Sequence, residues 1–297
     1  MRITNYWRVI YDYINHPLGR RDRLGTFKRI FQWQIGSRIL NASTAMPFVN
    51  GIRLLTSTGM HGATGNIYVG LMEFEDMAFV LHFLREGDEF IDVGANVGVY
   101  SLLAAASGAK SLALEPITAT YEQLLDNLYL NRFLDKIDAK NIGVGSQEGE
   151  LQFSTQSGPT NHVLARGEID HTALSIPVDR LDVIAADMNP VMIKMDVEGF
   201  EDEVIRGASR LLSQNSLKVV LIEMNGSGIR YGFKDSVIHD KLLSYNFKPA
   251  HYDPFSRKLC ILDKNNDFGN TLYVRSEVDV ENRLKCGLTI KWQNISI

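Results

Sequence analysis

Residues 88–98 read Asp-Glu-Phe-Ile-Asp-Val-Gly-Ala-Asn-Val-Gly, and this stretch decides the fold. Its apolar residues predict a short strand over 89–93, and a turn that holds Gly94 and Gly98 follows directly. The sequence over 99–107 is then compatible with a helix. A strand, a glycine turn and a helix N-terminus together let a nucleoside cofactor approach the backbone closely.

The spacing of the glycines indicates which cofactor to expect. A dinucleotide fingerprint reads G-x-G-x-x-G, whereas this turn reads Gly-Ala-Asn-Val-Gly and lacks the middle glycine. That pattern suits a mononucleoside such as S-adenosylmethionine better than a dinucleotide. Glu115 lies about 20 residues after Gly94, where an acidic side chain can accept hydrogen bonds from both ribose hydroxyls. The plainer alternative for Glu115 is a surface side chain that caps the next helix.

The rest of the chain alternates strands and helices, which predicts an α/β fold with a doubly wound, mostly parallel, Rossmann-like sheet of seven strands. The last two strands should form an antiparallel edge. Residues 150–154 predict a separate extended piece, and 155–175 predict a polar loop. Further strands are expected at 111–114, 137–144, 191–196, 217–223, 258–262 and 271–275, and helices at 73–84, around 121–128 and 204–212, and near 234–245.

We expect two parts: an N-terminal extension over 1–72 and a main domain over 73–297. In the extension, 1–50 predict short helices or loops, and 51–70 predict one or two β-hairpins. Residues 1–30 carry seven basic side chains against two acidic ones. This basic end predicts a weak contact with an acidic partner or a membrane surface. The plainer alternative is a solvated end whose aromatic side chains pack on the main domain.

Composition sets broad limits on function. The 297 residues are 45% hydrophobic and 22% charged with a formal net charge of −4, which is typical of a soluble globular protein and gives no reason to expect nucleic-acid binding. The two cysteines match no metal-ligand spacing. No signal-peptide core and no run of about 20 apolar residues is found, so we expect a cytoplasmic protein without a transmembrane segment.

Ligands of doubly wound sheets bind where the parallel strands end, and several polar residues follow the expected strands. Lys194 interrupts a buried strand, so its ammonium should pair with a carboxylate, either Glu223 or Glu198. Such a pair is either purely structural or orients a substrate. Candidate catalytic residues are Asp196, Glu198, Glu223 and Lys194.

A divalent cation and two loop histidines are further candidates for a role near these strand ends. Asp196, Glu198, Glu223 and Asn225 offer oxygen ligands for a divalent cation, but their spacing matches no metal motif, so we expect no resident metal. His162 and His171, in the loop over 155–175, can reach over a substrate, although a solvated loop histidine is the default.

Five sequence blocks together resemble the FkbM family of S-adenosylmethionine-dependent methyltransferases, whose activities are mainly O-methylations of sugars and polyketides. The resemblance runs from about 73 to 275, and the block at 193–201 is its most specific part. Met195 stands where the family more often has Ile. The blocks are Asp-Val-Gly-Ala-Asn-Val-Gly-Val-Tyr-Ser (92–101), Leu-Glu-Pro (114–116), Val-Asp-Arg-Leu-Asp (178–182), Ile-Lys-Met-Asp-Val-Glu-Gly-Phe-Glu (193–201) and Asn-Thr-Leu-Tyr-Val-Arg (270–275).

The resemblance implies a class I methyltransferase fold and S-adenosylmethionine as the cofactor. It implies that the glycine turn holds the methionine part of the cofactor, that Glu115 holds the ribose, and that Ile142 and Gly143 flank the adenine. The implied cofactor-binding residues are Asp92, Gly94, Ala95, Asn96, Gly98, Tyr100, Ser101, Glu115, Pro116, Asn141, Ile142, Gly143 and Asp196.

We therefore expect an O-methyltransferase that acts on a hydroxyl of a glycan or secondary-metabolite acceptor by in-line displacement. A hydroxyl is a poor nucleophile and gains from a positioned general base. Asp196 is the first candidate for that base, and Glu198 and Glu223 follow. Two alternatives stay open: an NAD-linked oxidoreductase, and a non-catalytic protein that keeps the cofactor fold as a scaffold.

Overall fold

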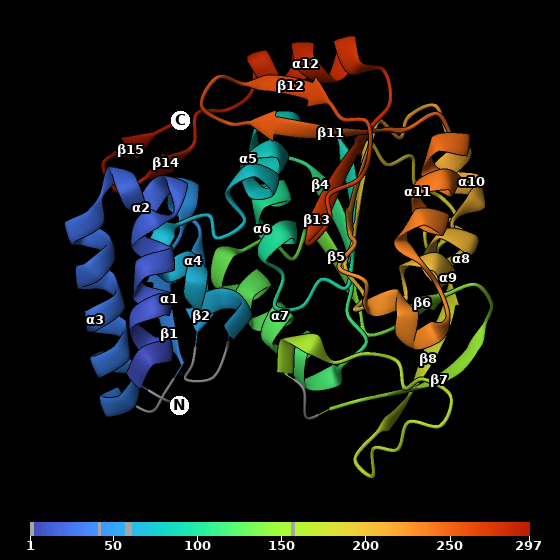
Figure 1. Ribbon diagram of the computed structural model, residues 1–297, viewed down its shortest axis with the longest axis horizontal. Helices are drawn as coiled ribbons and strands as arrows, with labels where there is room; N and C mark the ends of the chain where they lie inside the picture. The colour runs from blue at the N-terminus through green and yellow to red at the C-terminus, as the bar shows by residue number, and fades with distance from the viewer. Residues whose placement is uncertain (1–2, 41–42, 57–60, 156–157) are drawn as a thin grey trace.

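The computed structural model describes residues 3–40, 43–56, 61–155 and 158–297. A central sheet divides the main body, and helices cover both of its faces (Figure 1). The sheet has eight strands in the order β12-β11-β13-β10-β9-β3-β4-β5. Its parallel part consists of β3 (Glu89–Val93), β4 (Lys110–Leu114), β5 (Ile137–Lys140), β9 (Met192–Met195) and β10 (Val219–Glu223).

An antiparallel edge completes the sheet, and it is larger than the sequence predicted. The expected strands β12 (Lys258–Ile261) and β13 (Asn270–Val274) are present, but β11 (Lys248–Asp253) lies between them. The prediction of seven strands was therefore wrong by one. The sequence of β11 contains a proline together with Lys248, His251 and Asp253, so its own propensity for a strand is weak. Pairing with both neighbours makes it a strand.

Both faces of the sheet are buried under helices. Successive side chains along β3 point to opposite faces, so neighbouring residues join different core clusters. Phe90 joins a cluster with the helices α5 (Phe74–Phe83), α6 (Val99–Ala106), α7 (Thr118–Asn131) and α12 (Glu277–Lys285). Ile91 joins the cluster on the other face, under α8 (Leu181–Ile184), α9 (Glu201–Arg206), α10 (Ser209–Ser213) and α11 (Asp235–Ser244). Figure 1 shows α5, α6 and α7 on one side of the sheet and α8 to α11 on the other, with α12 beside β12.

A small second sheet of order β6-β8-β7 lies beside the strand ends. It contains β6 (Gly143–Gly145), β7 (Gly149–Phe153) and β8 (Leu174–Arg180). The single strand expected over 137–144 was wrong, because the chain leaves the central sheet after β5 and pairs with β8 instead. The described part of the loop over 155–175 contains a 3-10 turn, η2 (Gly158–Thr160), and the first residues of β8.

The N-terminal segment packs beside the main body (Figure 1). It holds α1 (Ile3–Asn15), α2 (Pro17–Arg21), the 18-residue α3 (Arg23–Leu40), the hairpin β1 (Thr44–Pro47) and β2 (Arg53–Thr56) around η1 (Val49–Gly51), and α4 (His61–Val69). The expectation of one or two hairpins within 51–70 was wrong where the structure describes it: only β2 lies there, its partner β1 lies within 1–50, where helices or loops were expected, and 61–69 are helical. Residues 57–60 lie outside the described residues. Ile67, Tyr68 and Val69 are buried against α1 and α3, which favours the helix there.

The C-terminal residues return to this N-terminal segment. In the hairpin of β14 (Lys291–Trp292) and β15 (Ile295–Ser296), the backbone N–H of Lys291 donates to Asn50 Oδ1 at 2.7 Å. The Trp292 ring lies so close to Gly70 that a Cβ there would approach it to 2.8 Å. Of the helices in the described residues, none has the length and apolar composition that crossing a bilayer requires.

Candidate active site

A pocket opens where β3, β4, β9 and β10 end, at the carboxyl ends of the parallel strands as expected. Its volume is about 260 Å³, just below the roughly 300–1,000 Å³ that is usual for ligand sites. Most of the predicted site residues line it: Gly94, Ala95, Asn96, Tyr100, Glu115, Pro116, Ile142, Gly143, Lys194, Asp196, Glu198 and Glu223.

The glycine turn holds two loops of the pocket together. The backbone N–H groups of Gly94 and Ala95 both donate to the carbonyl of Leu114, at 2.9 and 3.0 Å. Gly94 has a φ of +76°, and a Cβ at this position would lie 1.8 Å from the carbonyl oxygen of Asp196. Only glycine fits, because the end of β9 passes directly over the turn.

Glu115 is buried in the pocket wall and held by backbone groups. Its Oε2 accepts from the N–H of Asn96 at 2.9 Å, and its Oε1 accepts from the N–H of Ile117 at 2.9 Å. Burial raises the pKa of Glu115 to about 7, against the opposing effect of these hydrogen bonds. The carboxylate is therefore fixed in orientation and keeps further lone pairs for a ligand.

Four residues that we expected at the cofactor do not line the pocket. The hydroxyl of Ser101 donates to Asp92 Oδ2 at 2.7 Å, and both side chains are buried beneath the wall. Asn141 donates to the carbonyls of Glu115 and Pro116 and so braces the loop after β4. Gly98 is the N-cap of α6 in a left-handed conformation. These residues shape the site from behind.

Lys194 pairs with Asp196, and neither of the two predicted partners forms that ion pair. Its Nζ lies 2.9 Å from Asp196 Oδ2 and 4.7 Å from the centre of the Tyr100 ring. Residues two apart on a strand project to the same side, so Asp196 is the nearer carboxylate. Burial alone lowers the pKa of Lys194, but Asp196 and the neighbouring Asp92 outweigh it, and the pKa is raised.

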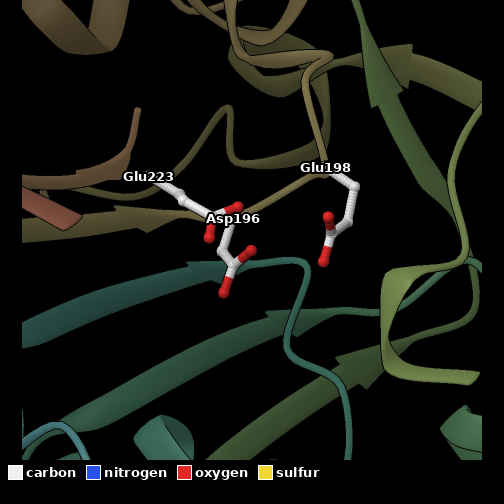
Figure 2. A group of neighbouring side chains, drawn as sticks. All are labelled: Asp196, Glu198 and Glu223. Atoms are coloured by element: carbon white, nitrogen blue, oxygen red, sulfur yellow. The ribbon is translucent and has the colours of Figure 1, made fainter. Parts of the chain in front are cut away.

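Three carboxylates gather at the ends of β9 and β10, as Figure 2 shows: Asp196, Glu198 and Glu223. One ligand atom from each lies within 4.8 Å of the others. Burial and the neighbouring negative charges raise the pKa of Glu223 to about 8 and that of Glu198 to about 7. Oε2 of Glu223 is buried and has no hydrogen-bond partner among the described residues.

Such a group needs either a cation or a proton to offset its like charges. The oxygen set is suited to a hard divalent ion, and in the described residues it is the one group with that geometry. However, the ammonium of Lys194 already lies against Asp196. With these pKa values, Glu223 is mostly protonated at neutral pH, whereas Glu198 is divided between its protonated and ionised forms. The Lys194 ammonium and the proton on Glu223 thus offset much of the negative charge.

The loop after β9 has a backbone that needs support. Glu198 is in the left-handed region with a φ of 55°, and Gly199 follows at 101°. A Cβ on Gly199 would lie 2.7 Å from the backbone of Ser227, in η3 (Ser227–Tyr231). The buried Glu201 accepts from the N–H groups of Val197 and Gly199 and fixes the loop. Glu201 was absent from our candidates, although it lies in the quoted block at 193–201.

The two loop histidines do not reach the pocket. His162 is buried in its own loop, where its ring nitrogens contact Glu168 Oε1 at 3.0 Å and the carbonyl of Thr160 at 3.0 Å. His171 is exposed. The amide oxygen of Asn225 accepts from the N–H of Ser227, and Asn225 does not line the pocket.

A family model described as the methyltransferase FkbM domain matches residues 92–249, more than half of the chain. The chain belongs to this family. Hexuronic acid methyltransferase AglP of Haloferax volcanii is 27% identical over 156 residues, which are 52% of this chain and 62% of that protein. Methyltransferase sdnD of Sordaria araneosa is 27% identical over 216 residues, 61% of this chain and 83% of that protein.

The chain thus spans less than two thirds of AglP. Among solved structures, methyltransferase FkbM of Methylobacillus flagellatus is similar with a TM-score of 0.44 and 16% identity, over 83% of this chain and 59% of that one.

The FkbM match begins at Asp92, and the pocket has walls that lie before it. Glu73 and Met77, at the start of α5, both line the pocket. The hydroxyl of Tyr100 donates to Glu73 Oε2, which ties the start of α5 to the first turn of α6. No sequence signal marked Glu73, because it looks like an ordinary residue before a helix. The opposite wall comes from the small sheet and its loop, with Phe153, Asn161 and Val163, and from Phe200 in the loop after β9.

Proposed function

We propose that the protein is an S-adenosylmethionine-dependent O-methyltransferase that acts on a neutral hydroxyl of a glycan or secondary metabolite. One observation carries the proposal: a single pocket joins the glycine turn and Glu115 on one side to the carboxylate group at the end of β9 on the other. Membership of the FkbM family supports methyl transfer over hydride transfer or a scaffold role.

The residues at the first side fit the cofactor. The backbone N–H of Asn96 and Ile117 orient the Glu115 carboxylate, which is the group that would hold the ribose hydroxyls. The Gly94 turn would hold the amino-acid part, and Ile142 and Gly143 would flank the adenine. When bound, S-adenosylmethionine supplies a methyl group that is already activated on a sulfonium.

At the other side we assign the general base to Glu198, with Asp196 as the alternative. A base works best when its pKa lies near the working pH, and the pKa of Glu198 is raised to about 7. Asp196 Oδ2 is engaged by Lys194 at 2.9 Å. In this proposal Glu198 takes the proton of the acceptor hydroxyl, and Lys194 with Asp196 keeps the adjoining wall fixed. Closure of the site around the acceptor excludes water.

The charges of the wall favour an uncharged acceptor. Among the described lining residues, Lys194 is the one basic side chain, against the acidic Glu73, Glu115, Asp196, Glu198 and Glu223. Since Lys194 is already paired with Asp196, none of the described lining residues offers a free cation to an acceptor carboxylate; Arg230 lies near Glu198 but does not line the pocket. AglP is named for a hexuronic acid, and we expect this chain to differ in that respect.

Two measurements test the proposal. Calorimetry with S-adenosylhomocysteine should show binding, and NADH should not compete. Transfer of a labelled methyl group should then be measured on matched neutral sugars and uronic acids, with the neutral sugars preferred. An intact protein that binds no S-adenosylhomocysteine would refute the cofactor assignment. Binding combined with faster transfer to uronic acids would refute only the acceptor assignment.

A further inference from the structure

The outer face of α3 is apolar and exposed, although the sequence led us to consider aromatic side chains packed on the main domain. Leu24, Phe27, Phe31, Ile35 and Ile39 are between 44% and 87% exposed. They follow one another at three- or four-residue spacing, so they form one stripe along the helix. We call these five residues the outer stripe.

The opposite face of α3 already accounts for its packing. Thr26, Ile30, Trp33 and Ser37 are buried on that side. Ile30 and Trp33 form a core cluster with Ile10 of α1 and with residues of α4. The outer stripe belongs to none of the core clusters of the described residues, and exposed apolar stripes of this kind mark interaction sites.

Basic side chains surround the outer stripe. Arg23, Lys28 and Arg38 are exposed, and none of them forms an ion pair among the described residues. The sequence of α3 contains no acidic residue. The helix thus combines an apolar stripe with unpaired positive charge, on a chain whose overall charge is −4.

We propose that the outer face of α3 docks the protein onto a lipid bilayer surface that carries anionic headgroups. A helix with an apolar face and a basic border lies in the membrane interface, with its apolar side chains among the acyl chains and its cations at the phosphates. The stripe from Leu24 to Ile39 extends about 22 Å along the helix, given a rise of about 1.5 Å per residue.

Charge complementarity favours this partner over a second copy of the chain. Two copies that meet through α3 would bring Arg23, Lys28 and Arg38 of each together with no carboxylate on either helix to pair with them. α1 adds two exposed aromatic side chains one turn apart, Trp7 at 63% and Tyr11 at 66%. Aromatic rings with a polar edge are enriched where protein meets the headgroup region.

Sedimentation with vesicles tests the proposal, using phosphatidylcholine alone and phosphatidylcholine with about 30% phosphatidylglycerol. The wild type should bind the anionic vesicles, and salt should weaken binding. Because each basic side chain contributes about fivefold, Lys28→Gln with Arg38→Gln should weaken binding about 30-fold. Phe27→Ser with Phe31→Ser should weaken it roughly tenfold or more.

The matched control is Phe268→Ser, since Phe268 is 82% exposed in the segment between β12 and β13. It should bind like the wild type, and thermal unfolding should be unchanged in all three variants because the altered side chains are exposed. Absence of binding to anionic vesicles would overturn the proposal, and so would equal binding to neutral ones. A dimer in analytical ultracentrifugation that Phe27→Ser with Phe31→Ser dissociates would overturn it in favour of self-association. None of these outcomes bears on methyl transfer.

Discussion

Replacement of Lys194 by Met should destabilise the protein in a way that depends on pH. Lys194 is only 4% exposed, and its Nζ lies 2.9 Å from Asp196 Oδ2, which is 30% exposed. The buried Asp92 lies opposite Lys194 on the neighbouring strand. Removing one partner of a buried pair leaves an uncompensated charge and costs about 3–5 kcal/mol. We expect the lower end, about 3 kcal/mol at pH 8, because Asp196 is partly solvated.

The loss should shrink as the pH falls. Burial already raises the pKa of Asp92 in the folded state, and loss of the ammonium would raise it further. A carboxylate with a raised folded-state pKa binds a proton more readily when folded than when unfolded, so lowering the pH stabilises the folded variant relative to the wild type, by at most about 1.4 kcal/mol per pH unit and group. The raised pKa of Lys194 itself lies above this range and adds no pH dependence between pH 5.5 and 8.

Urea unfolding followed by circular dichroism at pH 8 and pH 5.5 measures both effects. Lys264→Met is the matched control, since Lys264 lies 2.8 Å from Asp267 but both side chains are more than two thirds exposed. An exposed pair of this kind is worth less than about 1 kcal/mol. If Lys194→Met costs no more than the control, or costs the same at both pH values, the buried-charge argument is wrong. Reduced activity with unchanged stability would indicate a role confined to the substrate.

Three further predictions concern the pocket. Gly94→Ala should abolish binding of S-adenosylhomocysteine in calorimetry, whereas Gly87→Ala, with a similar φ of +86° and nothing within 4 Å of the added Cβ, should cost stability only. Glu198→Gln should lower the methyl-transfer rate about 10²–10⁴-fold and remove a rise in rate through about pH 7; an unchanged pH profile would move the base to Asp196. EDTA should leave the rate unchanged because Lys194 and bound protons already offset the carboxylates; a rate that EDTA abolishes and Mg²⁺ restores would contradict this.

The parallel strands and the residues at their ends could be predicted because buried strands are continuous apolar runs. β10 is such a run up to its last residue, Glu223, and β3 is mostly apolar although it contains Asp92. Glu223 at the end of β10 and Asn96 after β3 line the pocket as expected. The end of a strand can be located from the local sequence alone. Most of the pocket residues could therefore be predicted without knowing how distant segments pack.

Features that depend on distant segments could not be predicted in the same way. β11 is a strand because β12 and β13 pair with it, and its own sequence gives little sign of this. Glu73 enters the pocket because α5 packs on α6, more than 20 residues along the chain. The ion-pair partner of Lys194 could not be chosen from the sequence, because Asp196 follows on its own strand and Glu223 lies on the neighbouring one. The distance from the ammonium to each carboxylate is known only from the structure.

The loop after β9 combines a local sequence that can be recognised with contacts that depend on distant segments. Its sequence, Val197 to Glu201, can be recognised, but the reason for each residue appears only in three dimensions. Gly199 permits contact with the backbone at Ser227, and Glu201 binds two N–H groups that the bend leaves free. A non-glycine residue in the left-handed region is uncommon and costs about 1 kcal/mol or more. Glu198 is held there, beside two other carboxylates, by a loop built to keep it in the pocket wall. Strain and like charge at one side chain would serve no purpose in the fold, so they favour a role for Glu198 in the chemistry of the site.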